Sequence, residues 1–419
     1  MAETVGTAPG TAGTAGGAGV PEAPGGSGAD GVVGVGPAGR LALLDVLRGV
    51  AILGTLMTNV WIFAAPGAEW GVVSGNLTAA SFGASWAGAV EGAFRFVADG
   101  KFLSMLTILF GVGLAIQFQS AAKRGRTWPG RYKWRALFLF AEGTVHFVLV
   151  FAWDVLMGYA VVALLVAWQL TRTARTRRVL MWVAGGVHLV LLGLLTVAAA
   201  AGSAGGGGGA GSGGAGARVV ALYAEGSYAE QIAFRLQNAI ALRLEPVISF
   251  ALLVFLFHLG VRLYRAGAFR PDADGRRIRR RMCGWGLGVG VPLNVAAVAA
   301  GADWALVARY GAAPVVAVGY LGLVGLIVDR VRRPGPLTAG LTAIGRTALS
   351  CYVLQNALCV LACYGIGLGL AARWADAGPW WVIGLWATVC LVLFTGARLW
   401  LRRFSYGPLE SVQKRLLRS

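Results

Sequence analysis

Glu142 and His146 are the pair of residues best suited to chemistry, because a carboxylate and an imidazole stand one helical turn apart inside an apolar stretch. On a helix of about 3.6 residues per turn the two side chains share a face and can hydrogen-bond. Such a bond would hold the ring and raise its basicity. Asp154 follows at the outer end of the same stretch. The spacing predicts a catalytic acid–base site made of His146, Glu142 and Asp154.

His188 and His258 complete the three histidines of the chain. They lie among Val, Leu and Phe residues and have no acidic neighbour in the sequence. Burial disfavours the charged imidazole when no carboxylate is near. We therefore expect both to be neutral rings bonded to a neighbouring helix.

A polar stripe runs down the apolar stretch 41–64, where Asp45, Arg48, Thr55 and Asn59 fall on one side of a helix. Asp45 and Arg48 are close enough in sequence to form an ion pair. One interpretation is that the stripe lines a substrate cavity. The other is that the charges only set the depth of the helix while Asn59 bonds to another helix.

Polar residues at the edges of other apolar stretches are further candidates for substrate binding, although anchoring at the membrane surface explains some of them equally well. Asp99 and Lys101 flank the start of the stretch 100–120, and Gln355 lies beside Asn356 in the stretch 346–371. The full set of predicted substrate-binding residues is Arg48, Asp45, Asn59, Arg135, Asp99, Lys101, Arg346 and Gln355.

The composition predicts that membrane-spanning helices position these residues. The chain is 57% hydrophobic and 13% charged, with a mean hydropathy of +0.68, which lies outside the range of soluble domains. A bilayer core needs about 20 apolar residues per helix. Stretches of about that length lie at 41–64, 100–120, 135–152, 155–171, 179–201, 246–264, 283–301, 312–328, 346–371 and 380–400. Because none alternates with a period of two, we predict an all-α polytopic bundle of about ten transmembrane helices and not a β-barrel.

The Lys and Arg residues gather in every second gap between these stretches, at 123–135, 172–178, 262–281, 330–346 and 398–418. Short cytoplasmic loops retain cations during insertion, so we predict that both termini are cytoplasmic. The same asymmetry explains the net charge of +19. Since no aromatic residues interleave with the cations as in a strand-gripping surface, the sequence does not indicate nucleic-acid binding.

One Gly-rich segment precedes the predicted helices and a second separates the fifth from the sixth. Residues 1–39 contain no Lys or Arg and no apolar core, which is typical of a disordered leader and not of a signal peptide. Residues 202–244 are expected to be an extracytoplasmic linker, flexible from Gly202 to Gly216, followed by an amphipathic segment. These segments divide the chain into transmembrane parts at 40–201 and 245–403 and a basic cytoplasmic tail at 404–419.

The five cysteines all lie in apolar stretches, so they indicate no disulfide framework. Cys359 and Cys363 stand one turn apart near Tyr352, which suggests a metal site, but small packing residues are the commoner explanation. We therefore predict no metal site. The soluble-enzyme motifs GxSxG and HExxH are absent.

Five stretches carry a family resemblance: Leu44 to Asn59 (LDVLRGVAILGTLMTN), Asp99 to Gln117 (DGKFLSMLTILFGVGLAIQ), Gly143 to Tyr159 (GTVHFVLVFAWDVLMGY), Gly345 to Gln355 (GRTALSCYVLQ) and Phe404 to Glu410 (FSYGPLE). Together and in this order they resemble the YeiB-like family of bacterial inner-membrane proteins. The resemblance covers nearly the whole chain after the leader. It implies a multi-pass protein of the bacterial plasma membrane, in a family whose biochemical function is largely unknown.

A more distant similarity concerns the pattern Leu44, Asp45, Leu47, Arg48. It resembles the first helix of the transmembrane acyltransferases, which move acyl groups from cytoplasmic donors to sugars outside, and of the lysosomal heparan glucosaminide acetyltransferase group. The similarity implies transfer of an acyl group from a cytoplasmic donor to an extracytoplasmic or membrane acceptor. The donor would be acyl-CoA, bound as a substrate and not as a permanent cofactor.

The chain departs from the sugar acyltransferases at Asn59, where those enzymes carry their histidine. Asn at this place resembles the heparan group, whose reactive histidine lies in the following outer loop, but residues 65–99 here contain no histidine. Acyl transfer would therefore need His146 as its base. Arg48 and Arg135 would hold the CoA nucleotide, and Asn59 or Gln355 would stabilise the carbonyl oxygen.

Two other functions remain open from the sequence. Buried acids beside a histidine are also typical of a proton-coupled small-molecule transporter or exporter, although no internal repeat is visible. A non-enzymatic membrane scaffold would use the polar stripes only for helix packing. The expected partners are the lipid bilayer and a small-molecule, lipid or glycan acceptor, with no nucleic acid, and the oligomeric state is left open.

Overall fold

The computed structural model describes residues 42–74, 82, 85–204, 213–331 and 333–417, and every regular element among them is a helix. The predicted leader, 1–39, and residues 205–212 of the predicted linker lie outside this range. The predicted all-α class is confirmed for the described part of the chain.

In the described part of the chain, the N-terminal half begins with seven helices, of which all but the single turn α2 have thirteen residues or more. They are α1 (Ala42–Ala64), α2 (Trp70–Val73), α3 (Trp86–Ala98), α4 (Lys101–Lys123), α5 (Tyr132–Leu149), α6 (Leu156–Gln169) and α7 (Ala174–Ala204). Four shorter helices follow: α8 (Gly213–Glu225), α9 (Tyr228–Gln237), α10 (Ala239–Leu242) and α11 (Leu244–Ile248). Part of the predicted linker is therefore helical, because α7 continues to Ala204 and α8 begins at Gly213.

The C-terminal half has a different succession of helices. It contains α12 (Phe250–Arg265), α13 (Ala273–Ala299), the 3₁₀ turn η1 (Ala302–Trp304), the π-helix η2 (Val307–Ala312), α14 (Ala313–Arg330), α15 (Pro336–Arg346), α16 (Ala348–Cys363), α17 (Leu370–Arg373), α18 (Trp380–Arg403) and α19 (Pro408–Leu416).

Six helical segments among the described residues are long and apolar enough to cross a membrane. They are Ala42–Ala64, Trp86–Lys123, Ala174–Ser203, Ala273–Ala299, Ala302–Arg330 and Trp380–Arg403. α15 and α16 pass the same test as a pair that is bent by 93°, which makes a seventh if the pair is one span. The chain thus has the helices of a membrane protein.

Each of the ten predicted stretches coincides with a helix, but ten crossings are not confirmed. α6 and α12 have 14 and 16 residues, fewer than the about 20 that a straight crossing requires. α5 carries Lys133, Arg135 and Glu142 within its 18 residues. α6 and α12 are largely buried in the bundle, whereas α5 exposes Trp134, Leu137 and Val145. Length separates α6 and α12, and charge separates α5, from the six clear spans.

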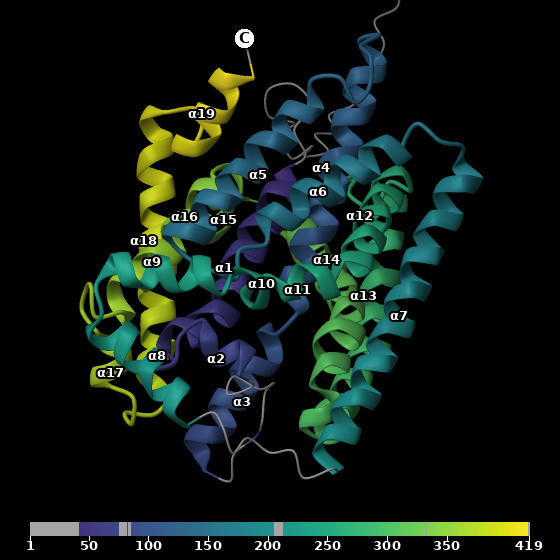
Figure 1. Ribbon diagram of the computed structural model, residues 1–419. Coiled ribbons are helices and arrows are strands. Elements are labelled where there is room, and N and C mark those ends of the chain that lie inside the picture. Colours follow the sequence, from purple (N-terminus) through teal and green to yellow (C-terminus); the bar gives the residue numbers. More distant parts are fainter. Residues whose placement is uncertain (1–41, 75–81, 83–84, 205–212, 332, 418–419) are drawn as a thin grey trace, which may run out of the picture.

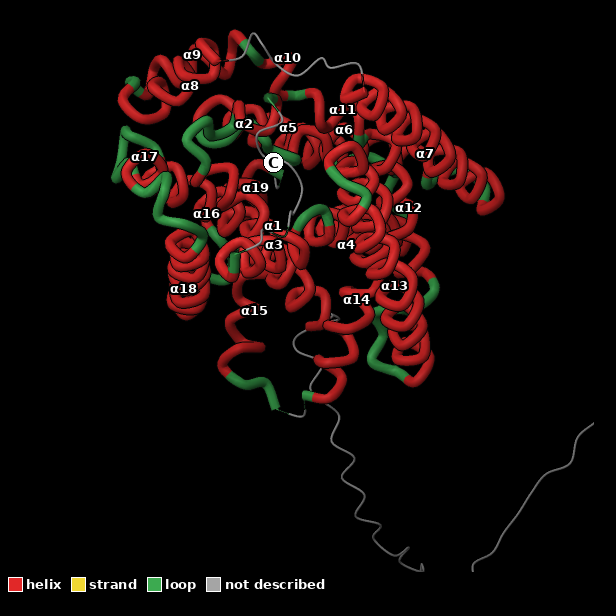
Figure 2. The backbone as a smooth tube through the Cα atoms, turned by 90° about the horizontal axis from the view of Figure 1, so that it is seen from below, coloured by secondary structure: helices red, strands yellow, loops and turns green. Residues whose placement is uncertain are grey.

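α1 lies inside the bundle and packs against α4, α15, α16 and α18 (Figures 1 and 2). Its contact with α15 is unusually close: a Cβ atom on Gly345 would lie 1.8 Å from the carbonyl oxygen of Asp45. A Cβ on Gly49 would lie 2.2 Å from the carbonyl oxygen of Leu341. Because neither position has room for a side chain, the two glycines allow the backbones to touch.

The lipid-facing helices are recognisable from their exposure. In α7 only 17% of the most apolar window is buried, against 67% in α1. The large side chains that α7 leaves exposed include Val187, Leu189, Val190 and Leu194. A helix that is apolar on its outer face fits a hydrocarbon surrounding. Figure 2 shows α7, α13 and α18 at the periphery around the inner helices.

The two ends of the bundle differ in charge. α19 and the end of α18 lie at the upper end in Figure 1, with Arg402, Arg403, Lys414 and Arg415 in their last turns. We call this the basic end. α2, α3, α8 and α17 lie toward the other end, which we call the distal end.

Candidate functional site

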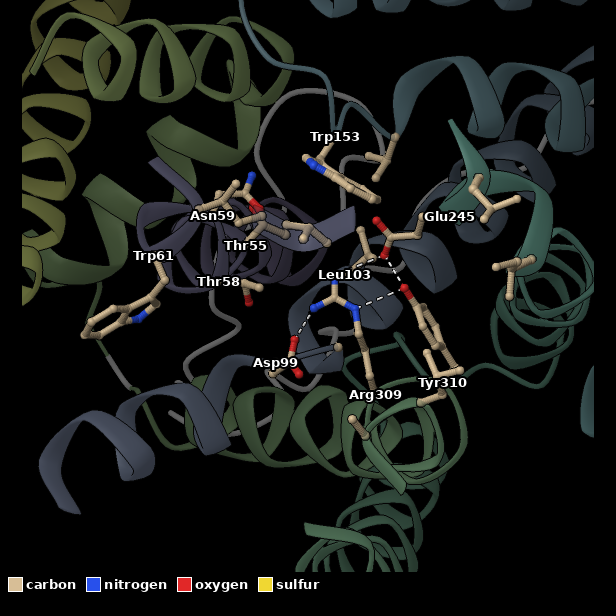
Figure 3. Close-up of a pocket in the computed structure, with 18 of the residues that line it drawn as sticks. Thr55, Thr58, Asn59, Trp61, Asp99, Leu103, Trp153, Glu245, Arg309 and Tyr310 are labelled. Carbon is tan, nitrogen blue, oxygen red and sulfur yellow. Dashed lines mark hydrogen bonds and ion pairs between the residues drawn. The ribbon is translucent and has the colours of Figure 1, made fainter. Parts of the chain in front are cut away.

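A cavity of about 400 Å³ lies between α1, α3, α4, α11 and η2. This volume is large enough for a small-molecule ligand. Figure 3 shows Thr55, Thr58 and Asn59 of α1 on one side and a group of charged residues on the other. Apolar side chains such as Ile62, Leu244 and Leu306 complete the wall. Trp61, Trp153 and Tyr352 also line it.

The charged group joins three segments through Arg309 of η2. Its guanidinium is paired with Asp99 and, at 3.0 Å, with Glu245 of α11. Its Nε donates to the Tyr310 hydroxyl at 3.1 Å, and that hydroxyl donates to Glu245. We call Asp99, Glu245, Arg309 and Tyr310 the Arg309 network. It lies on a π-helix, an irregularity that is frequent at functional sites.

Gly100 allows the network to form. The residue has φ +71°, a left-handed conformation that favours glycine, and a Cβ there would lie 2.4 Å from the carbonyl oxygen of Arg309. The turn between α3 and α4 therefore presents Asp99 directly to η2. The sequence pair Asp99–Gly100 is explained by this close approach.

Two predicted substrate-binding residues, Asn59 and Asp99, line the cavity. Lys101 is next to the network in sequence but is not among the lining residues. Its Nζ donates to Asn294 Oδ1 at 2.6 Å and to the Phe96 carbonyl, and the residue is 2% exposed. In this arrangement Lys101 ties the start of α4 to α13.

His146 is buried and is held by α16. Its Nε2 lies 3.0 Å from Asn356 Nδ2, and its ring stacks on Tyr352 with centroids 5.3 Å apart. Nδ1 has no partner among the described residues. The expected hydrogen bond to Glu142 is not formed, since Oε2 of Glu142 is also buried without a partner. The orientation of the imidazole is therefore set by contacts with α16 and not by a residue of its own helix, α5.

Asp154 caps the start of α6. Its Oδ2 accepts from the backbone N–H of Leu156 at 3.0 Å and of Met157 at 3.4 Å, whereas Oδ1 has no partner among the described residues. Burial raises the pKa of Asp154 to about 7, although the nearby Arg243 guanidinium acts in the opposite direction. Arg243 also donates to the Asp154 carbonyl at 2.8 Å.

Gln355 is fully buried, and neither its oxygen nor its nitrogen has a partner in the described part of the chain. Six of the unpartnered buried atoms in the described part of the chain belong to four predicted residues and to Asn356 beside them. They are Glu142 Oε2, His146 Nδ1, Asp154 Oδ1, Asn356 Oδ1 and both side-chain atoms of Gln355. Most buried polar atoms in proteins are paired, so these groups are able to bind water or a ligand.

The remaining predicted substrate-binding residues lie away from the cavity. Asp45 and Arg48 form the expected ion pair, at 3.2 Å. Arg135 donates to Gln117 Oε1 at 3.3 Å, and Arg346 donates to the Ser405 carbonyl at 3.3 Å. Arg346 thereby contacts the segment between α18 and α19, at the basic end. The predicted binding residues thus divide into two groups, one at the cavity and one elsewhere.

Glu245, Arg309 and Tyr310 were not among the predicted residues. Arg309 is a cation in the gap 302–311, which otherwise belongs to the cation-poor gaps, and Glu245 immediately precedes the stretch 246–264. The sequence signal that could have found Arg309 is its position, because the sidedness rule disfavours a cation in this gap. For Glu245 the signal is a charge at the edge of an apolar stretch. Their meeting depends on three segments distant in sequence.

The other two histidines behave as expected. His188 Nε2 lies 3.0 Å from the Tyr310 carbonyl oxygen, and His258 Nε2 lies 2.5 Å from Gln169 Oε1. Each bond joins two helices, which confirms the prediction of structural imidazoles.

Glu410 connects two of the motifs that carry the family resemblance, the one at 404–410 and the one at 345–355. Its Oε1 accepts from the backbone N–H of Leu349 at 2.8 Å and of Ser350 at 3.3 Å, and its Oε2 accepts from the Ser350 hydroxyl. The carboxylate therefore satisfies the first free amides of α16. Because α16 carries Tyr352, Gln355 and Asn356, the tail helps to position the buried site.

A buried ion pair fixes the distal helices. Arg235 of α9 donates to Glu69 Oε2 at 2.9 Å, and both side chains are fully buried. The Tyr223 hydroxyl donates to the same oxygen at 2.7 Å, and the Ala152 amide donates to Oε1 at 3.0 Å. α8 and α9 are thereby attached to the loop between α5 and α6, which contributes Trp153 to the cavity.

Comparisons with known proteins show similarity to a family and to two relatives, none of which has an assigned function. Residues 263–419 match the family model described as "Protein of unknown function (DUF418)". The chain is 28% identical to "Uncharacterized protein YeiB" of Escherichia coli strain K12, over 90% of this chain and 96% of that protein. It is 24% identical to "Uncharacterized protein YxaH" of Bacillus subtilis strain 168, over 88% and 92%. No solved structure matches the chain. Over nearly its whole length the chain is therefore similar to uncharacterised YeiB-like proteins, and its C-terminal part matches a family of unknown function.

Proposed function

We propose that the protein is a transmembrane acyltransferase of the bacterial plasma membrane, in which His146 is the base. The observation that carries the proposal is the position of the imidazole directly behind Tyr352, a residue that lines the cavity. The imidazole is 2% exposed, bonded through Nε2 and stacked on Tyr352, while Nδ1 has no partner among the described residues. His188 also has an unpartnered Nδ1, but among the described residues its ring stacks on no cavity-lining side chain. A ring that is oriented by one nitrogen and free at the other is suited to move a proton.

The tautomer follows from the side chain of Asn356. An asparagine amide can present either its oxygen or its nitrogen to a ring. If the oxygen accepts from Nε2–H, the lone pair lies on Nδ1. His146 then takes a proton from an acceptor hydroxyl or amine while the acceptor atom bonds to the thioester carbonyl carbon of an acyl-CoA. The tetrahedral intermediate collapses, the CoA sulfur leaves, and the imidazolium returns the proton to it.

Tyr352 separates the base from the cavity. Its ring lines the cavity and stacks on His146. A change in the side-chain rotamer of Tyr352 would open the buried polar residues to an acceptor in the cavity. Gln355 and Asn356 carry amide N–H groups that can stabilise the oxyanion of the intermediate.

For the donor, we place the basic end in the cytoplasm, with both termini on that side and the ten apolar helices within the membrane. Arg48, Arg135 and Arg346 would then face the anionic nucleotide of acyl-CoA. The cavity and the Arg309 network would lie toward the outside, where the acceptor enters. The sidedness of Lys and Arg supports this placement.

The experiment is a comparison of lipids, cell-wall fragments and metabolites from a deletion strain that is complemented with variants. We expect one acylated product to be absent, to be restored by the wild type and by His258→Ala, and to remain absent with His146→Ala at equal amounts of protein in the membrane. His258 is the matched control because its imidazole is also buried and bonded to another helix. Full restoration by His146→Ala would overturn the proposal.

Transport is the second candidate, and the bend between α15 and α16 favours it. Discontinuous helices form the binding sites of many secondary transporters, and this pair turns by 93° just before Tyr352. Proteoliposomes that move an unchanged solute, and membranes that acylate nothing, would decide for a carrier. A scaffold ranks below both, because it has no use for the cavity or for unpartnered buried polar atoms.

A further inference from the structure

The Arg309 network has an unequal number of charges. Asp99 and Glu245 supply two carboxylates and Arg309 one guanidinium, so the network carries one more negative than positive charge. The bonds of the network use Asp99 Oδ1 and Glu245 Oε1 only. The second oxygen of each carboxylate has no hydrogen bond within the described residues. Both oxygens remain able to accept a bond from a ligand.

Two further cations, Arg95 and Lys101, lie close enough to Asp99 to offset part of this excess, but their bonds go to other groups. Arg95 lines the wall, but it is paired with Glu91 at 3.2 Å and lies over the Trp61 ring at 4.9 Å. Lys101 directs its Nζ to Asn294 and to the backbone of Phe96. Both cations therefore act on the charge of Asp99 from a distance. Within the part of the chain that the structure describes, neither contributes to the hydrogen bonds of the Arg309 network, so the second oxygens of Asp99 and Glu245 stay open.

The rest of the lining is apolar and aromatic. Trp153 and Tyr310 face the cavity beside Glu245, as Figure 3 shows, and Leu103, Ile248 and Leu306 supply aliphatic surface. Aromatic faces attract cations, and the attraction increases when the cation is desolvated. An anion would meet two carboxylates here at close range, which is unfavourable.

We propose that the cavity binds a small molecule with an ammonium group on an apolar body. The ammonium donates to the second oxygens of Asp99 and Glu245, and the apolar body packs against Trp153 and the aliphatic wall. Binding does not depend on whether the amine is afterwards acylated, carried or released.

The test uses the full chain in nanodiscs of phosphatidylglycerol. Bound radiolabelled phenethylammonium is measured, with empty nanodiscs as the blank for partition into lipid, and is displaced by unlabelled phenethyl alcohol or phenylacetate. A charge-assisted bond adds about 1.5–3 kcal/mol, so the ammonium should bind at least about tenfold more tightly than the alcohol. The carboxylate should compete least. Equal competition by all three compounds in the wild type would overturn the proposal without any variant.

Variants then locate the site. Glu245→Gln and Asp99→Asn should each weaken phenethylammonium binding by about tenfold. Asp303→Asn, which removes an acid of η1 that is not among the lining residues, should leave binding unchanged. His146→Ala should also bind as the wild type does, so failure of the catalytic proposal and failure of this one give different results. Wild-type affinity in both network variants would contradict the assignment.

The source of the ammonium is distinguished by the lipid. If the natural occupant is a lipid head group, nanodiscs that contain phosphatidylethanolamine should show a lower apparent affinity for phenethylammonium, because the head group competes. If it is a free amine, the affinity should be the same in both lipids. Either result supports an ammonium site and identifies its occupant.

Discussion

His146 and Asn356 meet across two helices, and this contact decides which way the imidazole turns. A carboxylate one turn away on the same helix is a local partner, yet the ring bonds to α16 and stacks on Tyr352. A stacked ring and a bonded amide together fix both the plane and the rotation of an imidazole. At the scale of single residues, therefore, tertiary contacts override the pairing that sequence spacing favours.

Asp154 provides a test by pH. Its carboxyl has a pKa of about 7 in the fold because of burial, against about 3.9 in an unfolded chain. Between these values the folded state holds a proton that the unfolded state has lost. The folding free energy should therefore be most favourable below about pH 4 and should weaken as the pH rises to about 7.

The measurement for Asp154 is thermal unfolding in detergent across this pH range. The Asp154→Asn variant, which cannot ionise at this position, should lose most of the decline between about pH 4 and 7 that the wild type shows. Parallel curves for the two proteins would mean that the carboxyl is ionised in the fold.

At the scale of helices, two contacts hold the site. α15 touches α1 through Gly345, and α19 caps α16 through Glu410. Neither residue touches the cavity. Both act on the helices that carry Asn59, Tyr352 and Asn356.

Gly345→Ala should be strongly destabilising, because its Cβ would lie 1.8 Å from the Asp45 carbonyl oxygen and one backbone must move. Overpacking of this kind costs about 1–3 kcal/mol or more. The matched control is Gly284→Ala on α13, where a Cβ meets nothing within 4 Å. Thermal unfolding of the two variants should separate them clearly, and equal midpoints would contradict the close crossing of α1 and α15.

Glu410→Ala should remove the cap of α16 and cost about 1–2 kcal/mol of stability. It should also lower product formation, since Tyr352 and Asn356 lie on the helix that loses its cap. Glu230→Ala removes the capping box of α9 and serves as control. We expect that variant to lose some stability and to keep its activity. If both variants retain full activity, the tail does not position the site.

Much of the helix arrangement was available from the sequence, because it depends on local properties. Apolar length placed a helix at each of the ten stretches, and Asp45 with Arg48 paired as their spacing suggested. The residues of the candidate site could be predicted from the sequence only in part. Asn59 and Asp99 do line the cavity, but Arg309 and Glu245 are brought to Asp99 by contacts between distant segments. No periodicity within one helix encodes such a meeting.

At the scale of the whole molecule, the charge difference between the two ends predicts orientation. Single cysteines at Arg126 and Asp376 report it, since both residues are exposed and lie in turns at opposite ends of predicted spans. In intact cells a membrane-impermeant maleimide should label Asp376→Cys and should reach Arg126→Cys only after permeabilisation. The wild type is the blank, because its five cysteines are buried or half-buried. The reverse labelling would invert the topology and place the donor on the wrong side.

The most direct measurement follows an acyl group from one side of the membrane to the other. Inverted membrane vesicles expose the cytoplasmic face, so labelled acetyl-CoA added outside them reaches the basic end. With the wild type, label should accumulate in a product that is retained in the membrane or the vesicle lumen. With His146→Ala at the same membrane level it should remain in acetyl-CoA. Equal transfer by the two proteins would contradict the account of His146 as the base.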